Sequence, residues 1–175
     1  VDNILPRYQV LHLHDWHAAM VAMLRQCVNE FERLNDIACV YTIHNLALQG
    51  IRPFKDDDSS LEAWFPSLSY DGQLLCDPRY PHCFNPMRSA INLADKVHVV
   101  SPSYSQEVQI ASNDAGGFFG GEGLERDLQQ AAEQGKLIGI LNGCDYTTQH
   151  PKQATLSELL EQIEATLFSW MAKNV

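Results

Sequence analysis

Short apolar runs alternate with amphipathic stretches along the chain. Four runs are rich in Val, Ile and Leu without a clean alternation of apolar and polar positions, and they cover residues 8–13, 38–43, 96–100 and 137–141. Runs of this kind are typical of strands that are covered on both faces. Because helical patterns lie between them, the order of elements predicts an α/β fold with a partial Rossmann-like parallel sheet and right-handed crossovers.

The first predicted strand runs directly into the polar and aromatic residues His14, Asp15, Trp16 and His17. We expect Asp15 to be the N-cap of the next helix, because a carboxylate there accepts hydrogen bonds from unpaired backbone N–H groups. Ligands of open parallel sheets bind at the carboxyl ends of strands, so this cluster is a candidate site. The helix is predicted from apolar residues on one face, which are Ala19, Val21, Ala22, Leu24, Val28, Phe31 and Leu34.

Two further strands also end in polar residues. The second strand is followed by His44 and Asn45 and then by Gln49, and the fourth strand is followed by Asn142. Since the carboxyl ends of parallel strands meet at one edge of a sheet, we expect these groups to lie beside the first cluster. A long irregular segment covers about residues 50–86, and loops of this length in compact domains are usually functional.

Local signals in the middle of the chain indicate helix starts and turns. Asn85 followed by Pro86 predicts a helix start, and Ser101 followed by Pro102 predicts another. Ser101 is therefore interpreted as a cap rather than a nucleophile, because no Gly-x-Ser-x-Gly pattern surrounds it. The acidic run at residues 56–58 is interpreted as a solvated turn.

Two segments complete the chain. The glycine-rich segment 113–123 matches neither a phosphate-binding loop nor a dinucleotide fingerprint, so we interpret it as a loop. Residues 155–173 form a predicted amphipathic helix without a basic face, which argues against a membrane role. The expected division is therefore a domain over residues 1–151 and a helical extension over residues 152–175.

Composition narrows the class of partner and the compartment. The 175 residues carry a formal net charge of −10, which argues against a nucleic-acid surface, and no segment is apolar enough to span a membrane. The five cysteines are irregularly spaced, and Cys27 and Cys39 stand in apolar patterns as buried free thiols do. A reducing cytoplasm is the simplest setting.

A metal or cofactor site is not predicted. Cys76, His82 and Cys83 lie close together in sequence, but prolines interrupt the segment and no fourth residue is spaced to complete a zinc site. A metal-dependent hydrolase that uses His12, His14, Asp15 and His17 is a second hypothesis. Strand geometry weakens it, because residues on either side of Leu13 point one way while Asp15 already begins a helix.

Several short motifs occur in a characteristic order and resemble the N-terminal domain of bacterial glycogen synthases and plant starch synthases. Members of this family are two-domain glycosyltransferases of the GT-B type that extend α-1,4-glucan from ADP-glucose. The resemblance covers roughly residues 8–146. The motifs are His14-Asp15-Trp16-His17, Thr42-Ile43-His44-Asn45-Leu46-Ala47-x-Gln49-Gly50, Asn85-Pro86-Met87-Arg88, Ala94-Asp95-Lys96-Val97, Val100-Ser101-Pro102-Ser103-Tyr104 and Ile140-Leu141-Asn142-Gly143-x-Asp145-Tyr146.

The resemblance implies roles for these residues and a retaining transfer of glucose to the non-reducing end of the glucan. His44 and Asp15 are then the catalytic residues, with His44 holding the glucose near its 6-hydroxyl and Asp15 lining the acceptor side of the cleft. No cofactor is implied, and the choice between ADP-glucose and UDP-glucose stays open. The substrate-binding residues are Asn45, Asn142, Trp16 and Gln49.

The resemblance also implies a missing partner. The family's Lys-x-Gly-Gly loop and its whole C-terminal domain, which supplies cations for the diphosphate, have no counterpart in these residues. We therefore expect the chain alone to be inactive and to expose apolar surface that favours self-association. The alternative hypothesis is a noncatalytic sugar- or glucan-binding module derived from such an enzyme.

Overall fold

The structure is a computed structural model of the chain that describes residues 8–143 and 155–173. The chain falls into two units, Val1–Asn142 and Gly143–Val175. The domain boundary expected at residue 151 lies outside the described residues, as do Cys144, Asp145 and Tyr146 of the last motif. Each unit is described by itself below.

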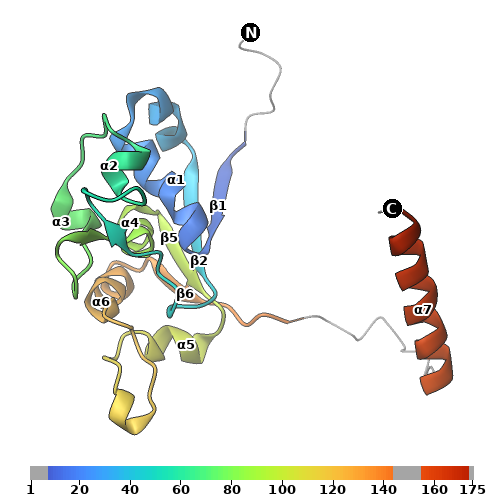
Figure 1. The fold of residues 1–175 in the computed structure, drawn as a ribbon. Coiled ribbons are helices and arrows are strands. Elements are labelled where there is room, and N and C mark those ends of the chain that lie inside the picture. The colour runs from blue at the N-terminus through green and yellow to red at the C-terminus, as the bar shows by residue number, and fades with distance from the viewer. Residues whose placement is uncertain (1–7, 144–154, 174–175) are drawn as a thin grey trace. The chain divides into compact units, whose positions relative to one another are not determined.

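A parallel sheet forms the centre of the first unit (Figure 1). Its strand order is β1-β2-β5-β6, and every neighbouring pair is parallel. This confirms the predicted parallel α/β sheet, and the predicted strand positions agree within two residues at each end. The strands are β1 (Val10–His14), β2 (Ala38–Ile43), β5 (Lys96–Val99) and β6 (Leu137–Gly139).

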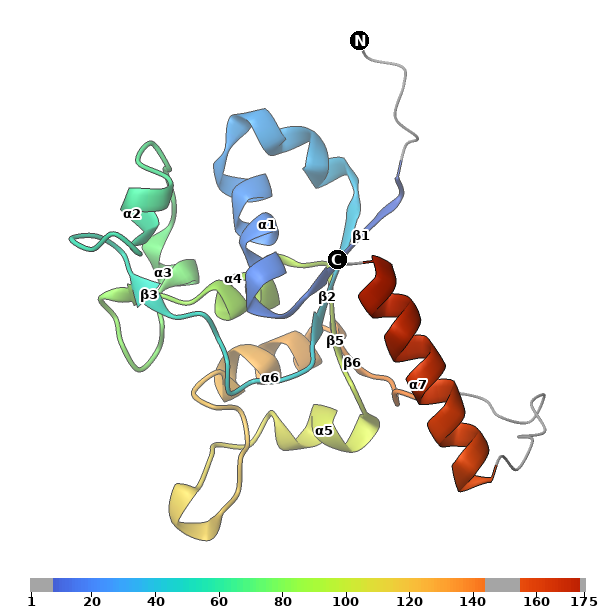
Figure 2. The ribbon, with the colours of Figure 1, turned by 45° about the vertical axis from the view of Figure 1, so that its right-hand side comes forward.

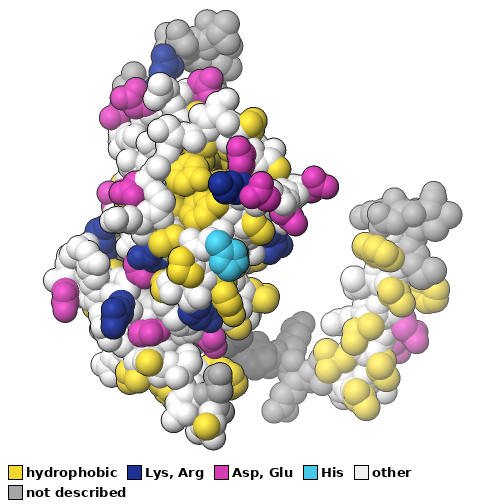
Figure 3. Space-filling model, turned by 60° about the vertical axis from the view of Figure 1, so that its left-hand side comes forward, with side chains coloured by type: hydrophobic (Ala, Val, Ile, Leu, Met, Phe, Trp, Pro, Cys, Tyr) yellow, Lys and Arg dark blue, Asp and Glu magenta, His cyan; other side chains and the backbone are white. Residues whose placement is uncertain are grey.

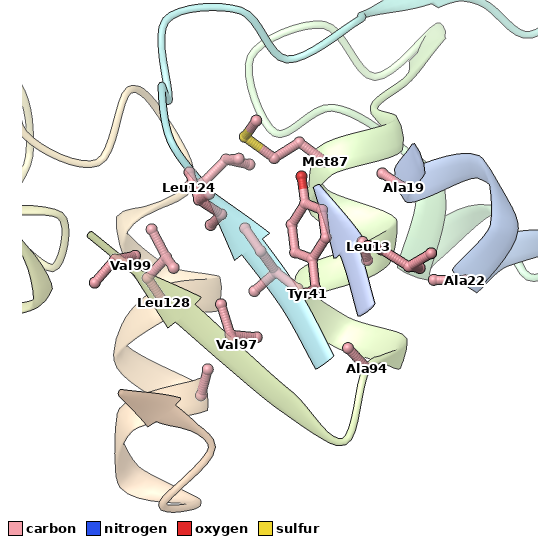
Figure 4. Packing of buried hydrophobic residues seen from close by; sticks show 14 of the residues in the cluster. Leu13, Ala19, Ala22, Tyr41, Met87, Ala94, Val97, Val99, Leu124 and Leu128 are labelled. Atoms are coloured by element: carbon pink, nitrogen blue, oxygen red, sulfur yellow. The ribbon is translucent and has the colours of Figure 1, made fainter. Parts of the chain in front are cut away.

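Three helices cover one face of this sheet: α1 (Asp15–Cys27), α4 (Pro86–Leu93) and α6 (Glu125–Glu133). Figure 2 views the sheet nearly edge-on, with all three on the same side. The core lies between these layers, where Leu13, Tyr41 and Val97 point from three strands towards the helices (Figure 4). Burying these apolar side chains supplies the main driving force for folding.

The other face of the sheet is much less covered by the described residues. Val10 is 54% exposed and Ile138 is 42% exposed, and their registers place them on the same face as His12 and His98. The expectation that the strands are covered on both faces is therefore wrong for this face. A continuous apolar run shows that a strand belongs to a parallel sheet, but it does not show which partner covers each face.

The segment between β2 and α4 contains short elements that pack on a second, smaller core. This core comprises Met23, Leu61, Leu75 and Phe84, each at most 1% exposed. One of these elements is a short helix that begins at Leu61. The elements before α4 are η1 (Asn29–Asp36), β3 (Arg52–Pro53), α2 (Leu61–Trp64), α3 (Gly72–Leu75) and β4 (Cys83–Phe84); later in the unit lie α5 (Pro102–Glu107) and η2 (Asp114–Gly116).

The caps predicted at Asn85 and Ser101 and the predicted acidic turn are confirmed by hydrogen bonds. The side-chain oxygen of Asn85 accepts from the N–H of Arg88 at 3.0 Å, and Ser101 Oγ accepts from the N–H of Tyr104 at 3.0 Å. In the acidic turn, Asp57 accepts from the backbone N–H of Ser59 at 2.7 Å. Ser101 is thus engaged as a helix cap.

The helix after β1 is shorter than predicted. It ends at Cys27, and residues 29–36 form the 3₁₀ segment η1, so Phe31 leaves the apolar face and is 42% exposed. Val28 is the residue at which the backbone becomes extended. Hydrophobic spacing alone did not reveal this change, because the three-residue spacing of Val28, Phe31 and Leu34 fits both helix types.

The second unit contains helix α7 (Leu156–Lys173), which confirms the predicted helix. Its apolar residues Leu156, Leu160 and Ile163 are 51–73% exposed within the described part of the chain. None of the helices in the described ranges is long and apolar enough to cross a membrane.

The exposed sheet face generates a prediction about association. We expect the 175-residue chain to self-associate through this face, since Val10 and Ile138 present apolar surface and β1 is an edge strand. Replacing both residues with Lys should shift sedimentation velocity profiles towards the monomer. The matched control is Ile110→Lys, since Ile110 is 55% exposed but lies after α5. A wild-type chain that stays monomeric at high concentration would contradict this prediction.

Candidate functional site

The carboxyl ends of β1 and β2 bring two histidines into contact. His14 is the last residue of β1 and pairs in register with Thr42, so His44 follows two residues later on the same side. Nδ1 of His14 lies 3.0 Å from Nε2 of His44, within hydrogen-bond distance, and the ring centroids are 5.3 Å apart. Both side chains are exposed, so they are accessible to a ligand.

Asp15 lies beside this pair but does not cap the helix as expected. The N-cap is His14, and no side chain accepts a cap hydrogen bond there. Instead, Oδ1 of Asp15 accepts a hydrogen bond of 2.8 Å from the backbone N–H of His44. Asp15 has a φ of +53°, a left-handed conformation that costs energy for a residue with a Cβ. The N-cap prediction was wrong because the carboxylate reaches across to β2 rather than along its own helix.

Asn45 opens a turn beside a small cavity. Its side-chain oxygen accepts from the N–H of Ala47 at 2.9 Å, and the buried side chain of Leu46 fixes the turn to the core. The cavity has a volume of about 320 Å³. Its lining comes from this turn, from α5 and from the glycine-rich segment, and comprises Asn45, Leu46, Ala47, Tyr104, Phe119, Gly120 and Glu122.

Trp16 is held by contacts on several sides. Its ring stacks on His17 with centroids 3.7 Å apart, and the guanidinium carbon of Arg52 lies 5.7 Å from its ring centroid. Gly50 has a φ of +73°, and a Cβ at that position would clash with the indole of Trp16. Only glycine fits there, so the predicted motif around Gly50 secures the position of Trp16.

Gln49 is not brought to the histidine cluster. It is 3% exposed, and its Nε2 donates to the carbonyl oxygens of Leu46 and Glu122. Its Oε1 accepts from Asn85 at 2.6 Å and from Arg79 at 3.2 Å. The amide group thus connects the second strand end with the segment before α4. Its role in substrate binding stays a prediction.

Asn142 lies at the same edge of the sheet as the histidine pair. Its backbone N–H donates to the carbonyl oxygen of Val100 at 3.2 Å, just beyond the end of β5. Its side chain is exposed. The structure therefore gathers His14, Asp15, Asn45 and Asn142 at one edge, as the parallel direction of the strands predicted, while their roles stay predictions.

A second polar row lies on the exposed sheet face. Nε2 of His12 is 2.7 Å from Oγ1 of Thr42, which in turn is 3.0 Å from Nδ1 of His98. The rings of His12 and His14 have centroids 4.3 Å apart, so this row adjoins the histidine pair. Burial, and then the positive charges of His14, His98 and His44, hold the pKa of His12 below its ordinary value of 6.5.

Sequence reasoning missed three residues near the site. Arg52 places a cation beside Trp16, and Phe119 and Tyr104 contribute aromatic surface to the small cavity. Phe119 is 69% exposed and lines the small cavity, so its ring is accessible to a ligand there. The aromatic pair within the glycine-rich segment was the available signal in the sequence. Nothing in the sequence indicated the contact of Arg52.

The described residues offer no metal centre. Within residues 8–143 and 155–173, no group of three or more His, Cys, Asp or Glu side chains is arranged to hold a metal ion. The geometry therefore does not support the hydrolase hypothesis. Burial also raises the pKa of the thiols of Cys27, Cys39 and Cys83, which disfavours the reactive thiolate.

A cavity larger than the one beside Asn45 lies away from these polar groups. Its volume is about 450 Å³, and its lining includes Cys27, Trp64 and Phe65. Cys27 is the last residue of α1, and at the usual rise it lies about 18 Å along the helix from Asp15. The cavity next to Asn45 is smaller but adjoins the polar cluster, so we place the candidate site there.

The fold and the site together define the class of the protein, which is an α/β domain with a ligand site at the carboxyl edge of a parallel sheet. The sheet is parallel, helices connect its strands, and polar side chains gather at its carboxyl edge. This is the place where α/β domains bind nucleotides and sugars.

Comparison with known proteins identifies the family. The family described as the starch synthase catalytic domain matches residues 2–130. A glycogen synthase of Clostridioides difficile is 36% identical over 143 residues, which cover 81% of this chain and 27% of that protein. A glycogen synthase of Bacillus cereus is 34% identical over 174 residues, which cover 94% of this chain and 32% of that protein. The chain belongs to the starch synthase catalytic domain family.

A solved structure supports the same assignment. The chain resembles the catalytic domain of starch synthase IV from Arabidopsis thaliana, solved with bound ADP and acarbose, with a TM-score of 0.62 and 31% sequence identity. The match covers 82% of this chain and 27% of the solved chain. The GT-B type of fold inferred from the sequence is thereby confirmed, and the chain spans about a third or less of the length of these relatives.

The histidine row generates a prediction about pH. Because the folded pKa of His12 is lowered, the unfolded chain binds a proton at higher pH than the folded chain does. Stability is therefore complete above the ordinary pKa of 6.5 and is lost as the pH falls through the lowered value. Urea midpoints measured from about pH 8 to about pH 5 should fall, and His12→Gln should flatten this dependence.

The control for this measurement is His82→Gln, since His82 is exposed and lies in the segment before β4, away from the row. It should keep the wild-type dependence. An unchanged pH dependence in His12→Gln would contradict the prediction.

Proposed function

We propose that the chain forms the sugar-binding part of a retaining glucosyltransferase of the glycogen synthase type. The reaction transfers glucose from ADP-glucose to the non-reducing end of an α-1,4-glucan. The observation that carries the proposal is the contact of His14, Asp15 and His44 at the carboxyl edge of the sheet, within the motifs shared with the family. The starch synthase IV relative, which binds ADP and acarbose, supports a nucleotide-linked donor and a glucan acceptor.

His44 serves as the hydrogen-bonding residue for the glucose in this proposal. Retaining transfer passes through a transition state with positive charge on the sugar ring while the diphosphate leaves. A neutral imidazole suffices, because a positioned donor stabilises the transition state by orienting the sugar. Nδ1 of His44 makes no hydrogen bond to the described part of the chain, so this nitrogen is available for a sugar hydroxyl.

Asp15 supplies negative charge near the reacting sugar. Only Oδ1 of its carboxylate is engaged within the described residues, by the backbone N–H of His44. The second oxygen can face the developing positive charge or an acceptor hydroxyl. The left-handed backbone of Asp15 fits this role, since strained conformations in folded proteins cluster at functional sites.

The small cavity beside Asn45 is the proposed start of the acceptor cleft. Tyr104 and Phe119 offer ring faces, and Asn45 offers a polar edge. Sugars present both apolar faces and hydroxyl edges, so a lining of this mixed kind suits them. Trp16, in the neighbouring motif, is a further proposed substrate-binding residue. Asn142 completes the proposed sugar contacts from the far side of the edge.

The remaining half of the chemistry belongs to the second GT-B domain, which is the proposed partner. The leaving diphosphate needs cations, and Arg52 is the one cationic side chain that the described residues place beside Trp16. Further cations and an acid then come from the other domain.

The proposed location is the cytoplasm, and neither nucleic acid nor a membrane is a proposed partner. The four described cysteines are free, as in a reducing compartment. On the face in Figure 3, Lys and Arg side chains are scattered among acidic and uncharged ones, and hydrophobic side chains gather in a patch above the middle of the face. Such scattered charge does not suit a phosphate backbone.

Substitution in the full-length protein tests the proposed roles. His44→Ala should lower kcat by about 10²–10³, the usual loss for one transition-state hydrogen bond. Asp15→Asn should also lower kcat, because it keeps an acceptor for the N–H of His44 but removes the charge. Thermal melting should change little in His44→Ala, because the ring is exposed and leaves no core cavity. Normal glucosyl transfer in both variants would show that the site is misassigned.

The noncatalytic alternative makes a different prediction for the 175 residues alone. The proposed enzyme segment should bind maltooligosaccharides weakly in calorimetric titrations and should elongate no glucan from ADP-glucose, for want of the second domain. Tight binding of glucan together with a normal rate in a full-length His44→Ala variant would favour a binding module. Glucan elongation by the isolated chain would contradict the division of roles between two domains.

A further inference from the structure

We propose that His14 is a positioning residue for His44, and that it fixes both the ring orientation and the tautomer of that side chain. The inference deepens the proposed function, since the importance of His44 in glucosyl transfer rests on it. The geometry of the pair itself does not depend on that function.

Two consecutive residues hold His44 at two points. The carboxylate of Asp15 accepts from its backbone N–H at 2.8 Å, and Nδ1 of His14 lies 3.0 Å from its Nε2. The first contact fixes where the chain leaves β2, and the second fixes the rotation of the ring. A side chain at an exposed strand end otherwise samples several rotamers.

His14 can act as a fixed support because it is itself held in place. Its backbone belongs to β1 and pairs with Thr42, which is 1% exposed. Its ring packs against His12 with centroids 4.3 Å apart, and His12 is hydrogen-bonded to Thr42 at 2.7 Å. The support therefore extends from the exposed pair to a buried hydroxyl on the central strand β2.

The contact also ties the tautomer of one ring to that of the other, and the proposal assigns the hydrogen to Nδ1 of His14. Of the two facing nitrogens, one carries the hydrogen and the other accepts it. When Nδ1 of His14 donates, Nε2 of His44 is the acceptor, and the neutral His44 ring carries its hydrogen on Nδ1. That is the nitrogen available for a sugar hydroxyl, so His44 becomes a hydrogen-bond donor to the substrate.

Two protonated rings are incompatible with this arrangement, because both facing nitrogens would then carry hydrogens. The neutral pair, with one hydrogen between the facing nitrogens, is therefore the arrangement that positions His44.

The proposed role of His14 differs from that of a residue that only stabilises the fold. Both rings are exposed, so removing the His14 ring opens no cavity in the hydrophobic core. What the substitution removes is the partner of Nε2 of His44. Loss of a residue that orients a functional group typically costs about 10–100-fold in activity.

The first test compares three variants of the full-length protein. His14→Ala should lower kcat about 10–100-fold, with a smaller change in the KM for glucan. His14→Asn should restore most of kcat, because its amide N–H can occupy nearly the place of Nδ1. His82→Gln is the matched control and should behave as wild type. Equal losses in His14→Ala and His14→Asn, or none in either, would overturn the proposal.

The second test is spectroscopic and needs no activity. Nitrogen-15 shifts of the imidazole rings in the 175-residue chain should show a single tautomer of His44, protonated on Nδ1. In His14→Ala the shifts should move to the average of two tautomers. An unchanged His44 tautomer in His14→Ala would overturn the proposal even if the activity fell. Normal activity of His44→Ala would instead refute the proposed function, whatever the tautomer.

Discussion

The parallel pairing of β1 with β2 is the constraint on which the candidate site depends. Residues 10–14 align with residues 38–42 in a single register, so the two strands end at the same level. This brings His14 and Asp15, which follow each other in the chain, against His44, thirty positions later. A slip by one residue would turn the histidines to the opposite face and would replace them with core side chains. The core packing of Leu13 and Tyr41 therefore also protects the geometry of the site.

A buried polar network holds the long segment that follows β2. The carboxylate of Asp77 is fully buried and accepts from the side chain of Asn85 at 2.7 Å and from two backbone N–H groups. Asn85 also donates to Gln49, and Gln49 fixes the backbone beside Gly50 and Trp16. An unpaired carboxylate at this depth would be strongly destabilising, so each partner is needed. The network explains how a segment of mostly irregular backbone keeps one edge of the site in place.

One face of the parallel sheet is left partly uncovered by the described residues. Its polar row, from His12 through Thr42 to His98, joins the site to a surface on which Val10 and Ile138 are exposed. Nε2 of His98 is buried and makes no hydrogen bond to the described part of the chain. Relatives of this chain are about three times as long, so further chain in such proteins is available to cover an equivalent face. A partner or further chain that covers this face would therefore bury the exposed apolar side chains and would also lie next to the histidine pair.

The sequence by itself determined the strand positions, the parallel order, the caps at Asn85 and Ser101, and the edge at which polar groups gather. These features depend on local pattern and on general rules of chain topology. Only the tertiary structure decided that Asp15 binds the backbone of His44 rather than capping its helix, and that Gln49 is buried in a network. It also decided which sheet face is covered and where Arg52 lies. These outcomes depend on side chains that meet across distant parts of the chain, and hydrophobic periodicity carries no information about such contacts.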